Sequence, residues 1–350
     1  MILQRLSLTH FRSYTKRTFQ FSPQSSLIVG PNAAGKTNIL EAIMFCATGK
    51  SFRADADREA IRWGSEMANV KCQMTNLPAG EAGETQLELF ITSGEVQGKK
   101  APLKKYLVNG VPRRMVDFVG NLRAVLFWPE HLELVTNSPS LRRKYLDSVL
   151  VQVDREYRRN LTSYERGLRQ RNKLLDGINE GSARRSQLLF WDQLLIAAGG
   201  YLTDARAAYI DYVNSYQLPA DGYQLEYDKS VISESRLEQY ADEEVAAKAT
   251  LVGPHRDDIV FYKENKNLST YGSRGEQRLA VLWLKLSELS FIEKKTGERP
   301  ILLLDDIFSE LDETHRGLVM DLIGKQQTVL TSADRDIMAV VGKEAQVIQL

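Results

Sequence analysis

The sequence predicts an α/β fold in which one mixed domain is split by an inserted α-helical lobe. Three observations predict this organisation. A glycine-rich segment at residues 30–37 stands between an apolar strand-like run and a helix-like run. After residue 128 the spacing of apolar residues changes from about two to about 3.6. Strand-like patterns return near residue 251 and recur to residue 350. We therefore assign residues 1–128 and 250–350 to the α/β domain and residues 129–249 to the inserted lobe.

Composition excludes several classes of protein. The chain has 350 residues, 43% of them hydrophobic and 26% charged, as in ordinary globular proteins. No apolar run approaches the roughly 20 residues of a membrane-spanning helix. The first residues alternate polar and apolar side chains, unlike a secretory signal, so we expect a cytoplasmic protein without membrane contact. Two cysteines and four scattered histidines give neither a disulfide framework nor a zinc-site spacing.

The N-terminal elements are expected to be strands. Alternation around Leu6 and Leu8, followed by Phe19 and Phe21, predicts a β-hairpin, and residues 27–29 predict a buried strand leading into the glycine-rich segment. Further strands are expected at residues 70–75 and 85–92. The segment 105–111 contains an Asn-Gly pair, which favours a hairpin with a type I′ turn.

The inserted lobe is expected to be a helical hairpin. Apolar residues recur on one helical face over residues 141–168, which predicts one long helix. A polar loop at residues 176–183 follows, and a second apolar stripe runs from residue 188 to about residue 216. Strands are expected again at residues 251–262, 301–304, 328–331 and 346–350, separated by amphipathic helices.

The glycine-rich segment matches the pattern G-x-x-x-x-G-K-[ST], with a strand before it and a helix after it. Such a loop turns backbone amides toward phosphate oxygens at a helix N-terminus. Lys36 is expected to reach the β- and γ-phosphates and to act in catalysis, and Thr37 to ligate Mg²⁺. A plain glycine-rich turn is the alternative reading. The residues predicted to contact the nucleotide here are Gly30, Pro31, Asn32, Ala33, Ala34, Gly35, Lys36, Thr37 and Asn38.

A second acidic motif completes the expected site. The apolar run at residues 301–304 ends in Asp305 and Asp306, a Walker B pattern. Asp305 is the expected Mg²⁺ ligand, and Asp306 is the expected base that orients or deprotonates the attacking water. The 269 residues from Lys36 to Asp305 and the lack of an N-K-x-D motif favour ATP over GTP.

Ser273, Gly275 and Glu276 open a predicted amphipathic helix shortly before the Walker B strand. One interpretation is a capping box formed by Ser273 and Glu276. The pattern also resembles the signature motif of ABC-class ATPases. That resemblance implies that Ser273 and Gly275 face the γ-phosphate bound by a second copy, in an ATP-dependent head-to-head homodimer. Residues 309–312 stand where this class has its dimer-contacting D-loop.

The chain resembles the RecF family along nearly its whole length. The segments that carry the resemblance are residues 10–14, 47–53, 139–147, 253–258 and 305–312. The resemblance implies an ABC-type, Rad50- and SMC-head-like P-loop ATPase domain with a helical lobe, and it adds Arg12 to the nucleotide-contacting residues. It also implies binding to single- and double-stranded DNA at gaps and junctions. The implied partners are RecR and RecO, with indirect assistance to RecA loading in DNA repair.

Two departures from the ABC pattern predict slow hydrolysis. The class has a Gln entering its helical lobe and a His after the strand that follows Walker B, whereas residues 126–129 and 331–334 stand in those regions here. Thr331 or Ser332 is the expected weak substitute for the γ-phosphate sensor. Arg274 and Glu276 also differ from the Gln-rich signature common in the family.

Positive charge is concentrated in the helical lobe. Residues 139–173 carry ten Lys or Arg against four Asp or Glu, although the net charge of the chain is only +1. Phosphate contacts supply most non-specific DNA affinity, so this segment is a candidate DNA surface. A solvated helix face is the alternative, and an ATP-gated scaffold or a transporter-type ATPase subunit would need no DNA contact. The predicted DNA-contacting residues are Lys50, Arg53, Arg142, Arg143, Arg158 and Arg159.

Overall fold

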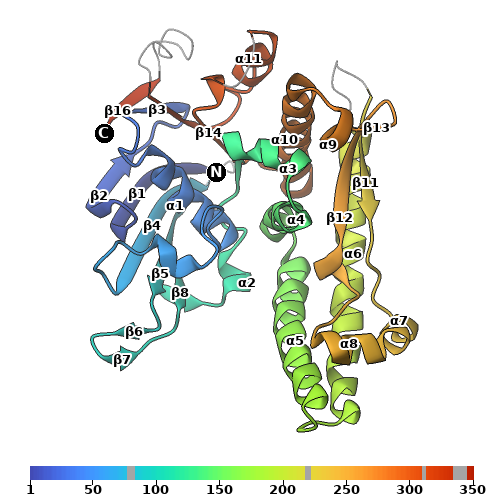
Figure 1. Ribbon diagram of the computed structural model, residues 1–350. Coiled ribbons are helices and arrows are strands. Elements are labelled where there is room, and N and C mark those ends of the chain that lie inside the picture. Colours follow the sequence, from blue (N-terminus) through green and yellow to red (C-terminus); the bar gives the residue numbers. More distant parts are fainter. Residues whose placement is uncertain (77–82, 217–221, 310–312, 334–344) are drawn as a thin grey trace. The chain divides into compact units, whose positions relative to one another are not determined.

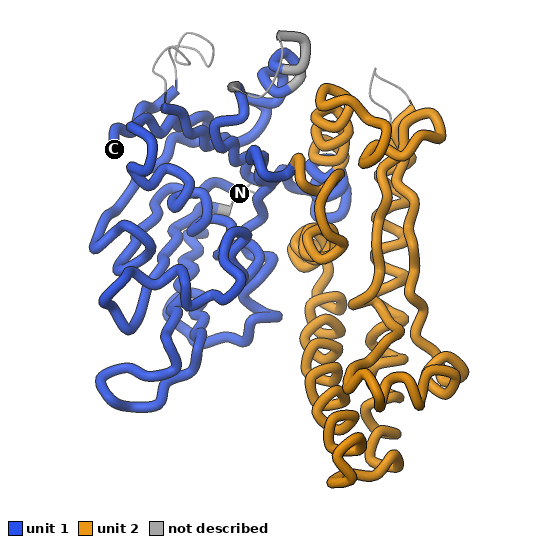
Figure 2. The backbone as a smooth tube through the Cα atoms, in the orientation of Figure 1, with its two compact units in different colours: residues 1–131, 288–350 blue, residues 132–287 orange. Residues whose placement is uncertain are grey.

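The computed structural model describes residues 1–76, 83–216, 222–309, 313–333 and 345–350. The chain forms two compact units, which Figure 2 colours separately: unit 1 contains residues 1–131 and 288–350, and unit 2 contains residues 132–287. Within the described residues, no helix has the length and apolarity needed to cross a lipid bilayer.

The first sheet of unit 1 is antiparallel and has the strand order β2-β1-β4-β5-β8-β9. It confirms the predicted N-terminal hairpin, whose Leu6 and Leu8 are fully buried. Asn109 and Gly110 both have positive φ, at 52° and 76°, as a type I′ turn requires. The strands are β1 (Ile2–Phe11), β2 (Tyr14–Gln20), β4 (Met67–Asn76), β5 (Gly83–Thr92), β8 (Lys104–Val108) and β9 (Val111–Arg113), and a separate ribbon contains β6 (Glu95–Val96) and β7 (Lys99–Lys100).

The second sheet of unit 1 is parallel, with the strand order β10-β14-β15-β3-β16. Helix α1 (Lys36–Thr48) packs against strands of both sheets. Because the strands are parallel, their carboxyl ends share one edge, where α/β proteins bind ligands. The strands are β3 (Ser25–Val29), β10 (Ala124–Phe127), β14 (Ile301–Asp305), β15 (Thr328–Ser332) and β16 (Gln346–Gln349), and the short helices are η1 (Asp57–Ala60), α2 (Met115–Phe118), η5 (Ile307–Ser309) and α11 (Glu313–Met320).

Unit 2 is built on a helical hairpin of α5 (Arg155–Asn179) and α6 (Leu189–Ser215), which lie side by side (Figure 1). A three-stranded antiparallel sheet, β11-β12-β13, completes it. Its other elements are η2 (Pro129–Leu132), which begins in unit 1, α3 (Glu133–Thr136), α4 (Pro139–Val153), η3 (Arg185–Leu188), β11 (Tyr223–Asp228), α7 (Glu234–Gln239), α8 (Ala241–Ala247), η4 (Pro254–Arg256), β12 (Asp258–Lys263), β13 (Lys266–Asn267), α9 (Leu268–Tyr271) and α10 (Arg274–Thr296), which continues into unit 1.

The prediction of one long helix over residues 141–168 is wrong, because helix α4 ends before Asp154 and helix α5 begins after it. Asp154 has an extended backbone, with φ −128° and ψ 113°. Its carboxylate accepts hydrogen bonds from the backbone amides of Glu156 at 2.8 Å and Tyr157 at 3.0 Å. Asp154 is therefore the N-cap of α5, and the apolar residues on its two sides belong to two separate helices.

The observed units also differ from the predicted domain boundary at residue 249. Residues 250–287, which the sequence assigned to the α/β domain, belong to unit 2. Strand β12 pairs with β11 along six residues of each strand, from Tyr223 opposite Lys263 to Asp228 opposite Asp258. The sequence did not predict a strand at residues 223–228. Without this partner strand, nothing in the sequence indicated that β12 belongs to the helical unit.

Candidate nucleotide-binding site

The phosphate loop of unit 1 joins β3 to α1, as predicted. Gly35 caps the helix with φ 100°, and Ala33 also has a positive φ of 65°. A Cβ atom on Gly35 would lie 2.7 Å from Ser13 Oγ and 2.9 Å from Tyr14 Oη. Glycine is required at this position because both the backbone angle and the space exclude a larger residue.

Lys36 is held against the loop that precedes it. Its ammonium donates hydrogen bonds to the carbonyl oxygens of Gly30 at 2.7 Å and Pro31 at 3.1 Å, and only 8% of the residue is exposed. The lysine side chain therefore folds back over the loop. This places a positive charge where the sequence predicts the phosphates.

A pocket of about 370 Å³ lies at this edge of the parallel sheet. It brings the phosphate loop together with both Walker B aspartates, the first of which, Asp305, is 269 residues after Lys36. Thr37 and Asp305, the predicted Mg²⁺ ligands, line the same pocket, and one carboxylate plus a hydroxyl fits a Mg²⁺ that also binds substrate phosphates. The lining residues are Asn32, Ala33, Gly35, Lys36, Thr37, Asn38, Arg53, Trp128, Pro129, Glu130, Asp305 and Asp306.

Thr331 on the neighbouring strand β15 positions the Walker B aspartates. Its hydroxyl donates to Asp305 Oδ1 at 2.6 Å and accepts from the backbone amide of Asp306 at 3.2 Å. Asp306 has a positive φ of 49°, unusual for a residue with a side chain. The hydroxyl expected to sense the γ-phosphate thus contacts the acidic motif instead.

Glu41 on α1 is a buried carboxylate that sequence reasoning missed. Arg12 donates to it twice, at 2.9 Å and 2.6 Å, and Ser51 Oγ donates at 2.5 Å, while Glu41 itself is fully buried. Arg12 also donates to the carbonyl of Glu59 at 2.9 Å. Through these hydrogen bonds the guanidinium of Arg12 links α1 to the segment that contains Glu59. A lone acid among the apolar residues of α1 was the available signal.

Two further contacts join neighbouring residues to the phosphate loop. Tyr14 Oη donates to the carbonyl of Gly35 at 3.1 Å, and burial raises the pKa of Tyr14 to about 12. Arg53, predicted to contact DNA, donates to Asn38 Oδ1 at 3.0 Å and lines the pocket. Lys50, three residues before Arg53, is exposed. The segment that follows α1 therefore contacts the first turn of the same helix.

Ser273 and Glu276 form the predicted capping box at the start of α10. The amide and hydroxyl of Ser273 donate to Glu276 Oε2 at 2.9 Å and 3.0 Å, and the Glu276 amide donates back to Ser273 Oγ at 3.3 Å. The amide of Ser273, the ammonium of Lys263 and the hydroxyl of Ser273 lower the pKa of Glu276 to about 2. Ser273 and Gly275 are exposed. Residues 310–312 of the predicted D-loop lie outside the described residues.

The predicted DNA-contacting arginines of unit 2 divide into buried and exposed residues. Arg142 is 8% exposed and binds both oxygens of Asp258, at 2.6 Å and 2.9 Å. Arg158 is also 8% exposed and donates to the carbonyl of Val151 at 2.5 Å. Phosphate contact does not fit these two, because their charges point into the protein.

The other two predicted arginines remain accessible to different degrees. Arg143 is half-buried and donates to the carbonyl of Asp257 at 2.7 Å. Burial lowers the pKa of Arg143. Arg159 is exposed and pairs with Glu156 at 2.7 Å. Arg159 is therefore the most accessible of the four arginines.

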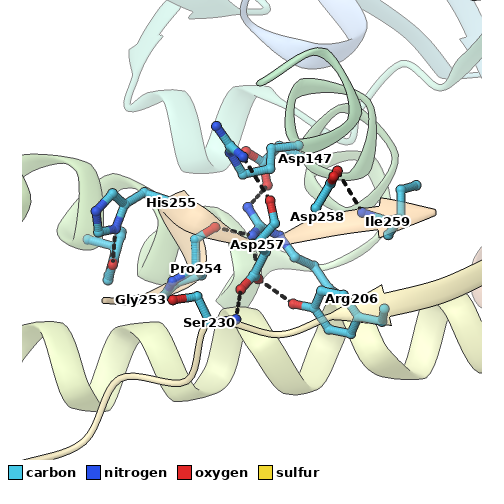
Figure 3. A network of polar contacts seen from close by, with 12 residues as sticks. Asp147, Arg206, Ser230, Gly253, Pro254, His255, Asp257, Asp258 and Ile259 are labelled. Atoms are coloured by element: carbon cyan, nitrogen blue, oxygen red, sulfur yellow. Dashed lines mark hydrogen bonds and ion pairs between the residues drawn. The ribbon is translucent and has the colours of Figure 1, made fainter. Parts of the chain in front are cut away.

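The segment 253–258 forms a buried polar network in unit 2 (Figure 3). Arg206, 3% exposed, donates to Asp147 at 2.8 Å, to Asp257 at 2.9 Å and to the carbonyl of Pro254 at 2.7 Å. The amide of Ser230 donates to Asp257, which is fully buried, at 2.8 Å. This network explains a family-like segment that no part of the nucleotide site uses.

The fold and the pocket define an ABC-type ATPase head of the SMC kind. A solved SMC head bound to a domain of ScpA has the same fold, with a TM-score of 0.50 and 19% identity over 100% of this chain and 94% of that one. The family model described as RecF/RecN/SMC N terminal domain matches residues 2–349. The chain belongs to the RecF family.

Relatives of this family match the chain over nearly its full length. The protein is 36% identical to the DNA replication and repair protein RecF of Lachnoclostridium phytofermentans, over 95% of this chain and 92% of that protein. The RecF of Chloroflexus aurantiacus is 37% identical over 95% and 94%. A solved structure of the recombination mediator protein RecF with ATP, in the RecFOR pathway, is 27% identical, with a TM-score of 0.85 over 99% of this chain and 95% of that one.

Proposed function

We propose that the protein is an ATP-dependent DNA-binding protein of DNA replication and repair, with slow ATP hydrolysis that regulates its hold on DNA. The observation that carries this proposal is the pocket that unites the phosphate loop with Asp305 and Asp306. The names of the relatives, which concern DNA replication and repair and RecF with ATP, support the same assignment.

In this proposal the phosphate loop and the two aspartates of the pocket have separate roles. The backbone amides of the loop after Pro31 and the ammonium of Lys36 bind the phosphates. Thr37 and Asp305 would hold Mg²⁺, which neutralises charge on the β- and γ-phosphates. Asp306 accepts a proton from the attacking water, and Thr331 keeps both aspartates in place through its two hydrogen bonds. Because that hydroxyl is engaged with the acidic motif, we expect weak stabilisation of the γ-phosphate and slow turnover.

The second half of the site comes from another copy of the chain. We propose that Ser273 and Gly275, both exposed, contact the γ-phosphate bound by a partner head. ATP would then join two heads, and hydrolysis would release them. Arg12 acts indirectly here, through Glu41 and the β1–β2 turn that borders the loop.

The remaining elements of the proposal are the DNA and its protein partners. The dimer would bind gapped or junction DNA and, with RecR and RecO, assist RecA loading. Lys50, Arg53, Arg143 and Arg159 remain candidates for phosphate contact, since each is at least partly exposed. Arg142 and Arg158 are not retained.

The test is DNA binding with ATP, with ADP and without nucleotide, in the wild type and in Lys36→Met. We expect ATP to increase affinity in the wild type only, and the variant to lose at least tenfold in ATP affinity, because a charged hydrogen-bonding group is removed. Lys325→Met, at an exposed lysine outside the pocket, serves as the matched control. DNA binding that ignores nucleotide, or a variant that still responds to ATP, would refute the assignment.

A further inference from the structure

One concentration of exposed positive charge in unit 1 was not recognised in the sequence. Residues 95–114 carry six Lys or Arg and one acid. Two of the cations have acidic partners: Lys104 binds Asp57 at 2.5 Å, and Arg114 lies 3.5 Å from Asp117. The remaining four are exposed, and they are Lys99, Lys100, Lys105 and Arg113.

The first two of these lysines lie on a short ribbon, formed by β6, β7 and their turn, which we call the basic ribbon (residues 95–100). Glu95 pairs with Lys100, and Val96 with Lys99. Gln97 and Gly98 form the turn with positive φ of 51° and 72°. In Figure 1 the ribbon extends beyond the six-stranded sheet of unit 1. The regular turn indicates a defined hairpin.

The geometry of the basic ribbon places charge on two sides. Neighbouring residues of a strand point to opposite faces, so Lys99 and Lys100 project in opposite directions. Lys105 follows Lys100 by five residues, which limits the strip from Lys99 to Lys105 to about 20 Å. Along the axis of duplex DNA each strand carries one phosphate per about 3.4 Å, so a strip of this length parallel to the axis covers about six phosphates of one strand. A two-stranded ribbon also fits the major groove, where both faces would meet phosphates.

An exposed aromatic residue lies close to the basic ribbon. Trp63 is 99% exposed, which is unusual for a tryptophan. It is three residues from Glu66, whose carboxylate accepts from the amide of Gln97 at 2.7 Å and whose carbonyl accepts from the amide of Ser93 at 3.2 Å. Three residues span at most about 10 Å, so the backbone of Trp63 lies close to that of Glu66, which contacts the turn.

We infer that the basic ribbon and Trp63 together form a DNA-binding surface of unit 1. The lysines contact phosphates of the duplex, and the indole stacks on an unpaired base where the duplex ends. The chemistry matches each part: ammonium groups bind phosphates regardless of sequence, and aromatic faces bind unstacked bases. This inference rests on the proposed DNA-binding function and names the surface that would recognise a gap or junction.

The first test measures affinity for blunt duplex DNA as a function of salt, in the full chain with ATP. Removing two phosphate contacts in Lys99→Gln/Lys100→Gln should make the slope of log affinity against log salt shallower by about two. Lys325→Gln, at an exposed lysine before β15, is the control and should keep the wild-type slope. A wild-type slope in the double variant would overturn the role of the ribbon.

The second test compares gapped with blunt duplex DNA. Trp63→Ala should weaken binding to gapped DNA on the order of tenfold and leave blunt duplex nearly unchanged, whereas Trp63→Phe should keep most of the gapped-DNA affinity. Equal losses on both DNAs, or none, would overturn the stacking role.

The wild type separates this inference from the proposed function. If the wild type binds no DNA in any nucleotide state, the proposed function fails. If the wild type binds and the ribbon variants bind equally well, only the present inference fails. If the double variant lost binding to anionic lipid vesicles but kept the wild-type salt slope on DNA, the surface would be a membrane-binding one. That result would also overturn the inference.

Discussion

The nucleotide pocket of unit 1 and the polar network of unit 2 both bury charge, but they satisfy it differently. In the network, Arg206 directs its nitrogens to Asp147, Asp257, a backbone carbonyl and the hydroxyl of Tyr157. In the pocket, Lys36 and Asp306 line a space of about 370 Å³. Ionic groups bonded to one another stabilise a fold, whereas ionic groups that line a space can also contact a ligand. Of the segments that resemble the family, residues 305–312 therefore contribute to the pocket, whereas residues 253–258 contribute to the polar network.

The largest expected effect is on stability, at the centre of the network. Arg206→Met should lower the free energy of unfolding by about 3–5 kcal/mol, because it leaves Asp147 and Asp257 without their buried cation. Urea unfolding would measure this. Arg159→Met, at an exposed i,i+3 pair, is the matched control and should cost less than about 0.5 kcal/mol. A loss below 1 kcal/mol in Arg206→Met would mean that the network does not stabilise the fold.

His255 makes the stability of unit 2 depend on pH. Its Nδ1 lies 2.8 Å from Tyr164 Oη, and its Nε2 lies 3.0 Å from the carbonyl of Thr250. Burial lowers the pKa of His255 to about 4, and Arg256, Arg143 and Arg171 add to this effect. The unfolded chain, with an ordinary histidine pKa near 6.5, binds a proton that the folded chain rejects.

Stability should therefore be greatest above pH 6.5 and fall as the pH decreases toward 4. We expect a loss of about 2 kcal/mol between pH 7.5 and pH 5 that is due to His255. The measurement is the difference in urea unfolding between the wild type and His255→Gln at the two pH values. If both proteins lose the same free energy, the histidine is not the source.

The sequence was sufficient to predict that the phosphate loop and the Walker B motif line one pocket, because the residues of each motif are contiguous in the chain. Residues 30–37 lie on one turn between a strand and a helix, and both Walker B aspartates end a strand of the same parallel sheet. Side-chain partners distant in sequence were not predictable. The partners of Arg142 and Arg206 are Asp258 and Asp257, which residues 223–228 help to place through strand pairing. Charge counting could not show that Arg142 and Arg158 point inward.

A substitution at Thr331 tests whether its hydroxyl positions the pocket aspartates. Thr331→Val keeps the shape of the side chain and removes both hydrogen bonds of its hydroxyl, so stability should fall by about 1–3 kcal/mol and ATP turnover should also fall. Thr328→Val on the same strand removes a bond to the carbonyl of Gln326 and is the matched control. It should lower stability without changing turnover. Equal turnover in both variants would show that Thr331 does not position the aspartates.

The smallest expected effect on stability separates the two roles of Ser273. As a helix cap, Ser273 accepts from the Glu276 amide at 3.3 Å, and asparagine caps about as well as serine. Ser273→Asn should therefore change the free energy of unfolding by only a few tenths of a kcal/mol. If the hydroxyl also contacts nucleotide on a partner head, ATP-driven dimerisation should weaken by roughly tenfold or more while ATP affinity of the single chain stays the same. Light scattering and equilibrium ATP binding would measure the two quantities. Dimerisation equal to that of the wild type would leave Ser273 as a helix cap alone and would remove the signature motif from the proposed composite site.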